Sequence, residues 1–257
     1  MSLTTDDVGH STPGAAPPPV PRHEKLAGHD TFVARVREVC DRPGTQQALR
    51  AGLGRPVDEV PARTHAALLR GGLVPDRSSV TDKRAYYAVA ALIAARPRAE
   101  RRADADARST ADSVMNNDAV GTVLSAEPVS PTEQPDPSQA AAARFSWGTS
   151  LGESLAELTM RRARATAPKE GAVHDPDVGK NRVSGVEQRL HLLVRQDIEG
   201  LHRMLPAVVR QLGSAGVPVD YGRLLHDLLQ WPRWRDETVR RWLEDHYRTL
   251  RLSQRPA

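Results

Sequence analysis

Hydrophobic residues recur every three or four positions over most of the carboxyl-terminal third of the chain. This spacing places apolar side chains on one face of an α-helix. The short polar connections between the stripes favour antiparallel neighbouring helices. We therefore predict a compact helical bundle over residues 145–252, with apolar stripes at Leu151–Leu158, Val186–Val194, Ile198–Leu212, Leu224–Leu229 and Val239–Tyr247.

Polar residues before these stripes predict where the helices begin. Ser184 and Glu187 have the spacing of a capping box, and Asp197, Asp220 and Asp236 each suit an N-cap. We expect the last of these to start a separate helix after a corner formed by Trp231, Pro232 and Trp234. Pro206 falls within a stripe and should bend or interrupt its helix.

Shorter stripes predict a second helical lobe over residues 29–97. Asp30 suits the N-cap of its first helix, and a short helix follows over Thr45 to Leu53. Pro61 suits the first turn of the next helix. Thr81 with Asp82 opens the central helix of this lobe, which stops at Pro97.

Two segments have no core-forming pattern. Residues 1–28 are rich in proline and small residues and predict a disordered arm. Residues 98–144 mix charges with prolines and predict a flexible insertion or linker between the lobes. The expected fold is therefore all-α, a two-lobed helical bundle with a disordered N-terminal arm, a long central insertion and a short tail at 253–257.

Composition favours an anionic partner without requiring one. The 257 residues carry 36 Lys and Arg against 32 Asp and Glu, a formal charge of +4. Most of the basic residues are arginine, whose planar guanidinium suits phosphate or carboxylate. A GC-rich genome would produce the same bias, so composition leaves the choice open.

The remaining composition indicates a cytoplasmic protein. Cys40 is the single cysteine, permits no internal disulfide and has the position of a small core residue. The first residues lack the apolar region of a signal peptide. No run approaches the roughly 20 apolar residues of a membrane span.

Catalytic and metal-binding patterns are weak. Residues 148–152 spell G-x-S-x-G, but a nucleophile elbow needs a strand before Ser150, and none is predicted. A helix N-cap at Ser150 or Thr149 is the better interpretation. The nine histidines show no metal-ligand spacing, and no phosphate-binding glycine loop occurs. We expect no cofactor, no metal and no enzymatic activity.

Arginines spaced by whole helical turns are the main candidates for function. Arg203 and Arg210 share one helix face, as do Arg241 and Arg248, and Arg189 and Arg195 lie on the preceding helix. Such a row could follow successive phosphates along a backbone. The alternative is a solvated face on which these arginines pair with Glu187, Glu199, Glu244 and Asp245.

The spelling of several segments resembles the CasB family, the small subunit of Cascade, the type I-E CRISPR interference complex. The similar segments are RLHLLVRQD (189–197), LHRML (201–205), GVPVDYGRLLHDLLQW (216–231), VRRW (239–242) and HYR (246–248). Upstream, ALRAGLG (48–54), AYYAVAAL (85–92) and SLGESL (150–155) also resemble family segments. The resemblance covers residues 30–97 and 145–252, and the insertion is longer than the family leads us to expect.

The resemblance implies an all-helical, non-enzymatic subunit that pairs with a second copy of itself beside the other Cascade subunits. It implies contacts with crRNA and target DNA, both single-stranded and as heteroduplex, which steady the strands when the R-loop opens. Carried over by position, the nucleic-acid contacts are Arg50, Arg189, Arg195 and Arg203, with Arg210 and Arg223 as weaker candidates. Two other classes stay open: a helical scaffold that binds an acidic protein partner, and a hydrolase built on Ser150.

Overall fold

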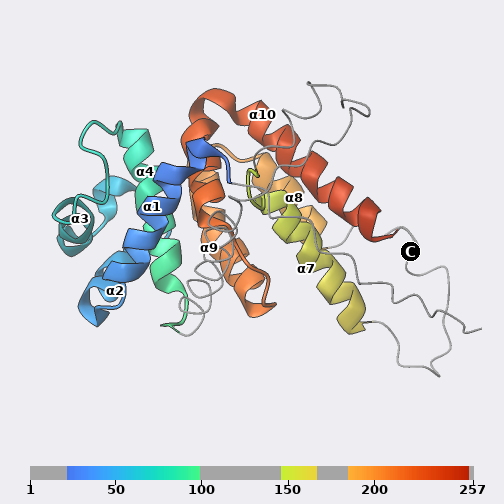
Figure 1. Ribbon diagram of the computed structural model, residues 1–257, viewed down its shortest axis with the longest axis horizontal. Coiled ribbons are helices and arrows are strands. Elements are labelled where there is room, and N and C mark those ends of the chain that lie inside the picture. The colour runs from blue at the N-terminus through green and yellow to red at the C-terminus, as the bar shows by residue number, and fades with distance from the viewer. Residues whose placement is uncertain (1–21, 99–145, 167–184, 255–257) are drawn as a thin grey trace, which may run out of the picture.

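The computed structural model describes residues 22–98, 146–166 and 185–254, and these residues form an all-α protein, as predicted. Residues 1–21 of the expected arm and 99–144 of the expected insertion lie outside the described residues. Figure 1 shows the helices in chain order: α1 (Glu24–Val39), α2 (Pro43–Arg50), the short 3₁₀ helix η1 (Val57–Glu59), α3 (Ala62–Leu69), α4 (Val80–Ala95), α7 (Leu151–Thr166), α8 (Gly185–Val194), α9 (Ile198–Ser214) and α10 (Tyr221–Ser253).

The last helix, α10, joins the two halves of the molecule. It packs against α7 on one side and against α1 and α4 on the other (Figure 1). The buried apolar residues accordingly form one continuous cluster, from Phe32 in α1 to Trp242 in α10. Cys40 is buried in this cluster, as expected. The two predicted halves therefore share a core, and the lobe boundary at residues 98–144 stays a prediction.

Three of the predicted helix N-caps are confirmed by their hydrogen bonds. Ser150 accepts a hydrogen bond from the Glu153 amide at 3.2 Å, and the Glu153 carboxylate accepts one from the Ser150 amide at 2.7 Å. Asp197 accepts from the Gly200 amide at 2.7 Å, and Asp220 accepts from the Arg223 amide at 3.0 Å. These bonds satisfy amides that the first turn of a helix leaves unpaired. The predicted cap Ser184 lies outside the described residues.

The start of the first helix was predicted wrongly. Helix α1 begins at Glu24, and His23, not Asp30, is its N-cap and accepts a hydrogen bond from the Lys25 amide at 3.1 Å. Asp30 lies inside the helix, where Arg22 binds its carboxylate. Residues 22–28 therefore have a defined structure, although they were expected to belong to the disordered arm.

Other boundaries shift by a few residues. Helix α2 begins at Pro43 and ends at Arg50, because proline is tolerated in the first helical turn. Ser79 caps α4, with Asp82 as the acidic partner of its capping box. Helix α9 runs without interruption through Pro206, so the predicted break does not occur.

Helix α10 spans 33 residues and comprises two helical segments that meet at a kink, which confirms the predicted pair of helices. The start of the second segment at Asp236 stays a prediction. The bend lies at the predicted corner: Trp234 has non-helical backbone angles, φ −130° and ψ 37°. Pro232 lacks an amide hydrogen to donate within the helix, and Trp231 is buried beneath the bend, 2% exposed. No helix among the described residues is long and apolar enough to cross a membrane.

Close packing of α7 against α10 yields the first prediction. A Cβ at Gly152 would overlap the backbone carbonyl of Trp242, whereas a Cβ at Gly28, on α1, would meet no atom within 4 Å. Gly152→Ala should therefore lower the free energy of unfolding by about 1–3 kcal/mol. Gly28→Ala is the matched control and should raise it by up to about 1 kcal/mol, because alanine favours helix. Urea unfolding followed by circular dichroism measures both, and equal effects would contradict the packing.

Candidate nucleic-acid interface

Five of the six predicted contact arginines lie on the surface. Helix α9 carries two of them and α8 carries one; the remaining two are the last residue of α2 and the residue that follows α8. Arg189 is half-buried, whereas the other four are exposed: Arg50, Arg195, Arg203 and Arg210. Within residues 22–98, 146–166 and 185–254, none of these five arginines has a carboxylate within ion-pair distance.

Three of the four carboxylates expected to neutralise these arginines bind other groups. Glu199 pairs with Arg84 at 2.6 Å. Glu244 pairs with Arg240 at 3.8 Å, one turn earlier on α10. Glu187 accepts a hydrogen bond from the Tyr247 hydroxyl at 2.7 Å. These three carboxylates therefore do not neutralise the surface arginines, which weakens the solvated-face alternative.

Helix α9 arranges part of this charge in a row. Arg203 and Arg210 lie seven residues apart and so share a face, with Pro206 between them. The loop after α2 reaches this region, since a Cβ on Gly54 would lie 3.7 Å from Cγ of Pro206. Arg50 begins that loop, and its carbonyl accepts a hydrogen bond from the Leu53 amide at 3.1 Å. The fold thus brings the α2 end and the α9 row into one neighbourhood.

Arg223, the sixth predicted contact, is in the interior and not available to a phosphate. Its side chain is 4% exposed and forms an ion pair with Asp227 at 3.2 Å. Its guanidinium also lies 4.9 Å above the ring of Trp147. Arg241 donates to the same Asp227 carboxylate at 2.8 Å, so it too is engaged within the fold. The position of Arg223 on its helix face did not predict that its side chain is buried and paired with Asp227.

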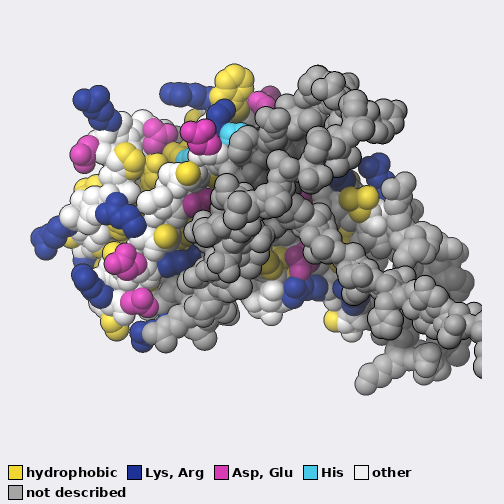
Figure 2. Space-filling model, in the orientation of Figure 1, with side chains coloured by type: hydrophobic (Ala, Val, Ile, Leu, Met, Phe, Trp, Pro, Cys, Tyr) yellow, Lys and Arg dark blue, Asp and Glu magenta, His cyan; other side chains and the backbone are white. Residues whose placement is uncertain are grey.

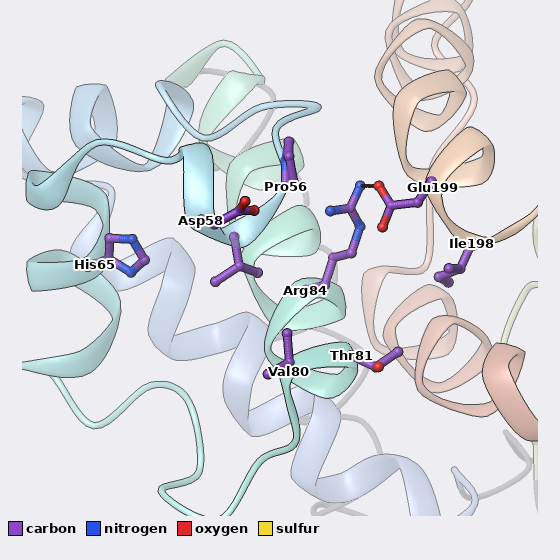
Figure 3. Close-up of a pocket in the computed structure, with 9 residues that line it drawn as sticks. Pro56, Asp58, His65, Val80, Thr81, Arg84, Ile198 and Glu199 are labelled. Carbon is purple, nitrogen blue, oxygen red and sulfur yellow. Dashed lines mark ion pairs between the residues drawn. The ribbon is translucent and has the colours of Figure 1, made fainter.

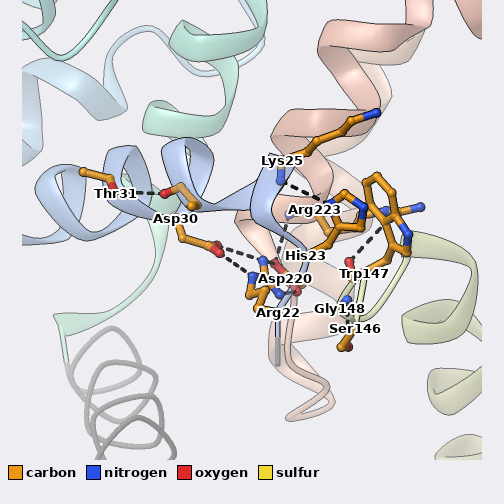
Figure 4. Close-up of polar contacts among 11 residues, drawn as sticks. Arg22, His23, Lys25, Asp30, Thr31, Ser146, Trp147, Gly148, Asp220 and Arg223 are labelled. Carbon is orange, nitrogen blue, oxygen red and sulfur yellow. Dashed lines mark hydrogen bonds and ion pairs between the residues drawn. The ribbon is translucent and has the colours of Figure 1, made fainter. Parts of the chain in front are cut away.

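An ionic cluster at Arg22 ties the start of α1 to the start of α10 (Figure 4). Arg22 donates to both carboxylate oxygens of Asp220, at 2.7 and 2.8 Å, and also binds Asp30. The His23 amide donates to the Ser146 carbonyl at 2.8 Å. Sequence reasoning missed this cluster because Arg22 follows a proline-rich stretch with no periodic signal.

The G-x-S-x-G motif does not form a nucleophile elbow. Ser150 is 2% exposed and acts as the N-cap of α7. Among the described residues, only an isolated bridge between Arg22 and Ser146 precedes it, where an elbow needs a strand. The described histidines, cysteine and carboxylates form no group able to hold a metal ion.

A pocket of about 390 Å³ lies between η1, α3, α4 and α9 (Figure 3). Its buried Arg84 is paired with Glu199, and His65 is hydrogen-bonded to the Tyr87 hydroxyl at 2.9 Å. The other lining residues are largely apolar, among them Val57, Val80 and Ile198. The Arg84–Glu199 pair joins α4 to α9, so we assign it a structural role.

One face of the molecule has no concentrated patch of basic side chains (Figure 2). Figure 2 shows one face, where Lys and Arg are spread over α1–α4 between acidic side chains. Such a mixed surface gives little net attraction for a polyanion. The arginines of α8 and α9 that have no carboxylate partner among the described residues are therefore the better candidates for an interface.

Comparisons with known proteins support this arrangement of helices. The sequence matches the family described as CRISPR-associated protein Cse2 over residues 47–247, which is most of the chain. The chain belongs to the Cse2 family. The match runs from α2 into the last part of α10 and so includes all five surface arginines. The resemblance to CasB is thereby confirmed.

Solved structures agree with the family. One chain described as "CRISPR RNA-guided surveillance complex" is 28% identical, with TM-score 0.57, and the alignment covers 90% of this chain and 97% of that chain. Another, from the pre-nicking form of such a complex, is 29% identical with TM-score 0.57, covering 89% and 96%. CasB from M. ruber is 20% identical with TM-score 0.54, covering 89% and 97%, and shows the fold. No curated protein matches the sequence.

A buried histidine beside the α9 row yields a pH prediction. Burial and the nearby Arg84 charge lower the pKa of His202 to about 3, and neither ring nitrogen has a partner among the described residues. Since the folded-state pKa lies below the ordinary value of about 6.5, the unfolded chain binds more protons between these values. The free energy of unfolding therefore carries no penalty from His202 above about pH 6.5, and it decreases as the pH falls from about 6.5 toward 3, because only the unfolded chain takes up this proton.

His202→Leu should therefore make the acid-side fall of the unfolding free energy shallower. Urea unfolding of wild type and variant at pH 7, 6 and 5 measures this difference. Parallel curves over that range would show that His202 is not held neutral by the fold. The comparison at pH 7 separates any loss of packing from the pH effect.

Proposed function

We propose that this Cse2-family chain is a non-catalytic small subunit of a CRISPR RNA-guided surveillance complex, and that it holds nucleic-acid backbone through the exposed arginines of α2, α8 and α9. The observation that carries the proposal is the unpaired state of Arg195, Arg203 and Arg210 among the described residues. An arginine next to a carboxylate is largely neutralised, whereas one facing solvent attracts phosphate at full charge.

The proposed partners follow from the family and from this charge. Two related chains belong to complexes described as CRISPR RNA-guided, which supports nucleic acid and other subunits of such a complex as partners. Base pairing with the guide RNA would read sequence, while this chain would supply backbone-directed charge to the heteroduplex and the displaced strand. A second copy of the chain would extend the same surface along the strands.

The second candidate is a helical scaffold that binds an acidic protein. Solvent-facing arginines suit carboxylates as well as phosphates. A competition experiment distinguishes the two functions. If the chain is a scaffold for an acidic protein and has no DNA site, excess DNA should displace little of that protein. We prefer nucleic acid because Arg203 and Arg210 lie about 10.5 Å apart along one helix face, an arrangement that can contact separate phosphates of one extended strand.

Removal of two exposed arginines tests the proposal. Arg195→Ala combined with Arg203→Ala should weaken binding to single-stranded DNA at low salt by about tenfold or more, since a hydrogen bond to a charged group contributes roughly 1.5 kcal/mol or more. Helicity and melting temperature should stay close to wild type, because both side chains are exposed. Fluorescence anisotropy with a labelled oligonucleotide gives the affinities.

Arg240→Ala is the matched control. Arg240 is also exposed, but it pairs with Glu244 on α10. Its loss removes one positive charge outside the proposed interface and should change the affinity little. An unchanged affinity in the double variant, or an equal loss per charge in the control, would refute the assignment of these arginines.

A further inference from the structure

Trp234 is the most exposed tryptophan of the chain. Its side chain is 57% exposed, whereas Trp231 and Trp242 are buried at 2% and 0%. Trp147 is 37% exposed, but His23 stacks on its ring at 3.8 Å and Arg223 lies over it. Among the described residues, Trp234 has no such ring contact. A large apolar ring is therefore left open to solvent.

The bend of α10 fixes this position. Trp234 itself carries the non-helical backbone angles, and the residues on both sides are anchored. Trp231 packs against Trp242 at 5.3 Å, and Arg235 donates to the carbonyls of Val194 at 2.8 Å and Gln196 at 3.3 Å. The exposed ring therefore extends from a restrained part of the backbone, as a binding platform requires.

Those same Arg235 bonds place the bend against the end of α8. Arg195, between the two carbonyls that Arg235 binds, is exposed and has no carboxylate partner among the described residues. Arg233, next to Trp234, is likewise exposed and unpaired within the described ranges. Asp236 is the acidic neighbour, and Arg235 pairs with it at 3.4 Å. Where α10 bends, Figure 2 shows hydrophobic and basic side chains next to one another, with an acidic one beside them.

Helix α8 continues this mixed surface away from the bend. Leu192 is 52% exposed and lies one turn before Arg195 and one turn after Arg189. An apolar side chain between two arginines offers contact to a base or sugar while the guanidinium groups hold phosphates. We name the surface formed by Arg189, Leu192, Arg195, Arg233 and Trp234 the bend surface.

We propose that Trp234 is a base-stacking platform for single-stranded nucleic acid, with the phosphates of the same strand held by Arg195 and Arg233. Every base has a π-face, so such stacking tolerates any sequence, and alternating aromatic and cationic groups suit a single strand better than a duplex, whose bases are covered. This proposal rests on the proposed function and adds a base contact to a surface otherwise directed at the backbone.

A strand that lacks bases separates stacking from charge. Trp234→Ala should weaken binding of the full chain to a 20-nucleotide oligo-dT by about 5- to 100-fold, the range for loss of one stacked base. On an abasic strand of the same length, wild type and Trp234→Ala should bind equally. Trp234→Phe keeps an aromatic ring and should restore much of the oligo-dT affinity. Anisotropy on both strands gives these ratios.

Leu69→Ala is the control for loss of exposed apolar surface. Leu69, on α3, is 50% exposed and lies outside the bend surface, so oligo-dT affinity should stay as in wild type. Arg195→Ala should weaken binding to both strands alike, because it acts on phosphates.

Each other outcome overturns the proposal in a recognisable way. Equal oligo-dT affinity of Trp234→Ala and wild type removes Trp234 from the site while leaving the arginine surface intact. An equal loss on both strands means that Trp234 positions the backbone contacts and does not stack. If wild type binds neither strand, the proposed function fails as well. If Trp234→Ala keeps its affinity but loses self-association in sedimentation, a second copy of the chain covers the ring instead.

Discussion

The buried carboxylate of Asp227 holds the bent helix α10 together. It is 0% exposed and lies in the first half of the helix, next to Arg223. From the second half, Arg241 donates to it at 2.8 Å and the indole nitrogen of Trp242 donates at 2.7 Å. A buried carboxylate is costly unless several donors satisfy it, so these bonds and the bend depend on each other. The bend in turn allows α10 to pack on α1 and α4 with one half and to continue along α7.

This interior network also sorts the arginines by role. Arg22, Arg84, Arg223 and Arg241 each bind a carboxylate that joins elements distant in the sequence or spans the bend. The arginines of α8 and α9 have no such partner among the described residues and remain at the surface. The arginines that stabilise the fold are thus different residues from the arginines that can bind a ligand. In the same way, the bend that buries Trp231 and Trp242 leaves Trp234 open to solvent.

The sequence predicted the helices well because their apolar stripes are long and because each N-cap bonds to a residue close to it in the sequence. Ser150, Asp197 and Asp220 bond to amides three residues away, which a sequence displays directly. Arg223 and Asp227 have an i,i+4 spacing, but only tertiary packing shows that the pair is buried. Arg22 binds Asp220, a residue 198 positions away, and no local pattern contains that contact. The sequence predicts the corner between two helical segments, which the kink at Trp234 confirms, but the exposure of the Trp234 ring depends on how the two segments pack.

Salt dependence of nucleic-acid affinity tests the central claim most directly, because contact through backbone phosphates releases counterions. For the wild-type chain, the logarithm of the association constant for single-stranded DNA should fall linearly with the logarithm of salt concentration. Three to five phosphate contacts predict a slope of about −2 to −4, and strands of equal length but different sequence should give nearly the same slope. A slope near zero, or strong binding to one sequence alone, would contradict the account.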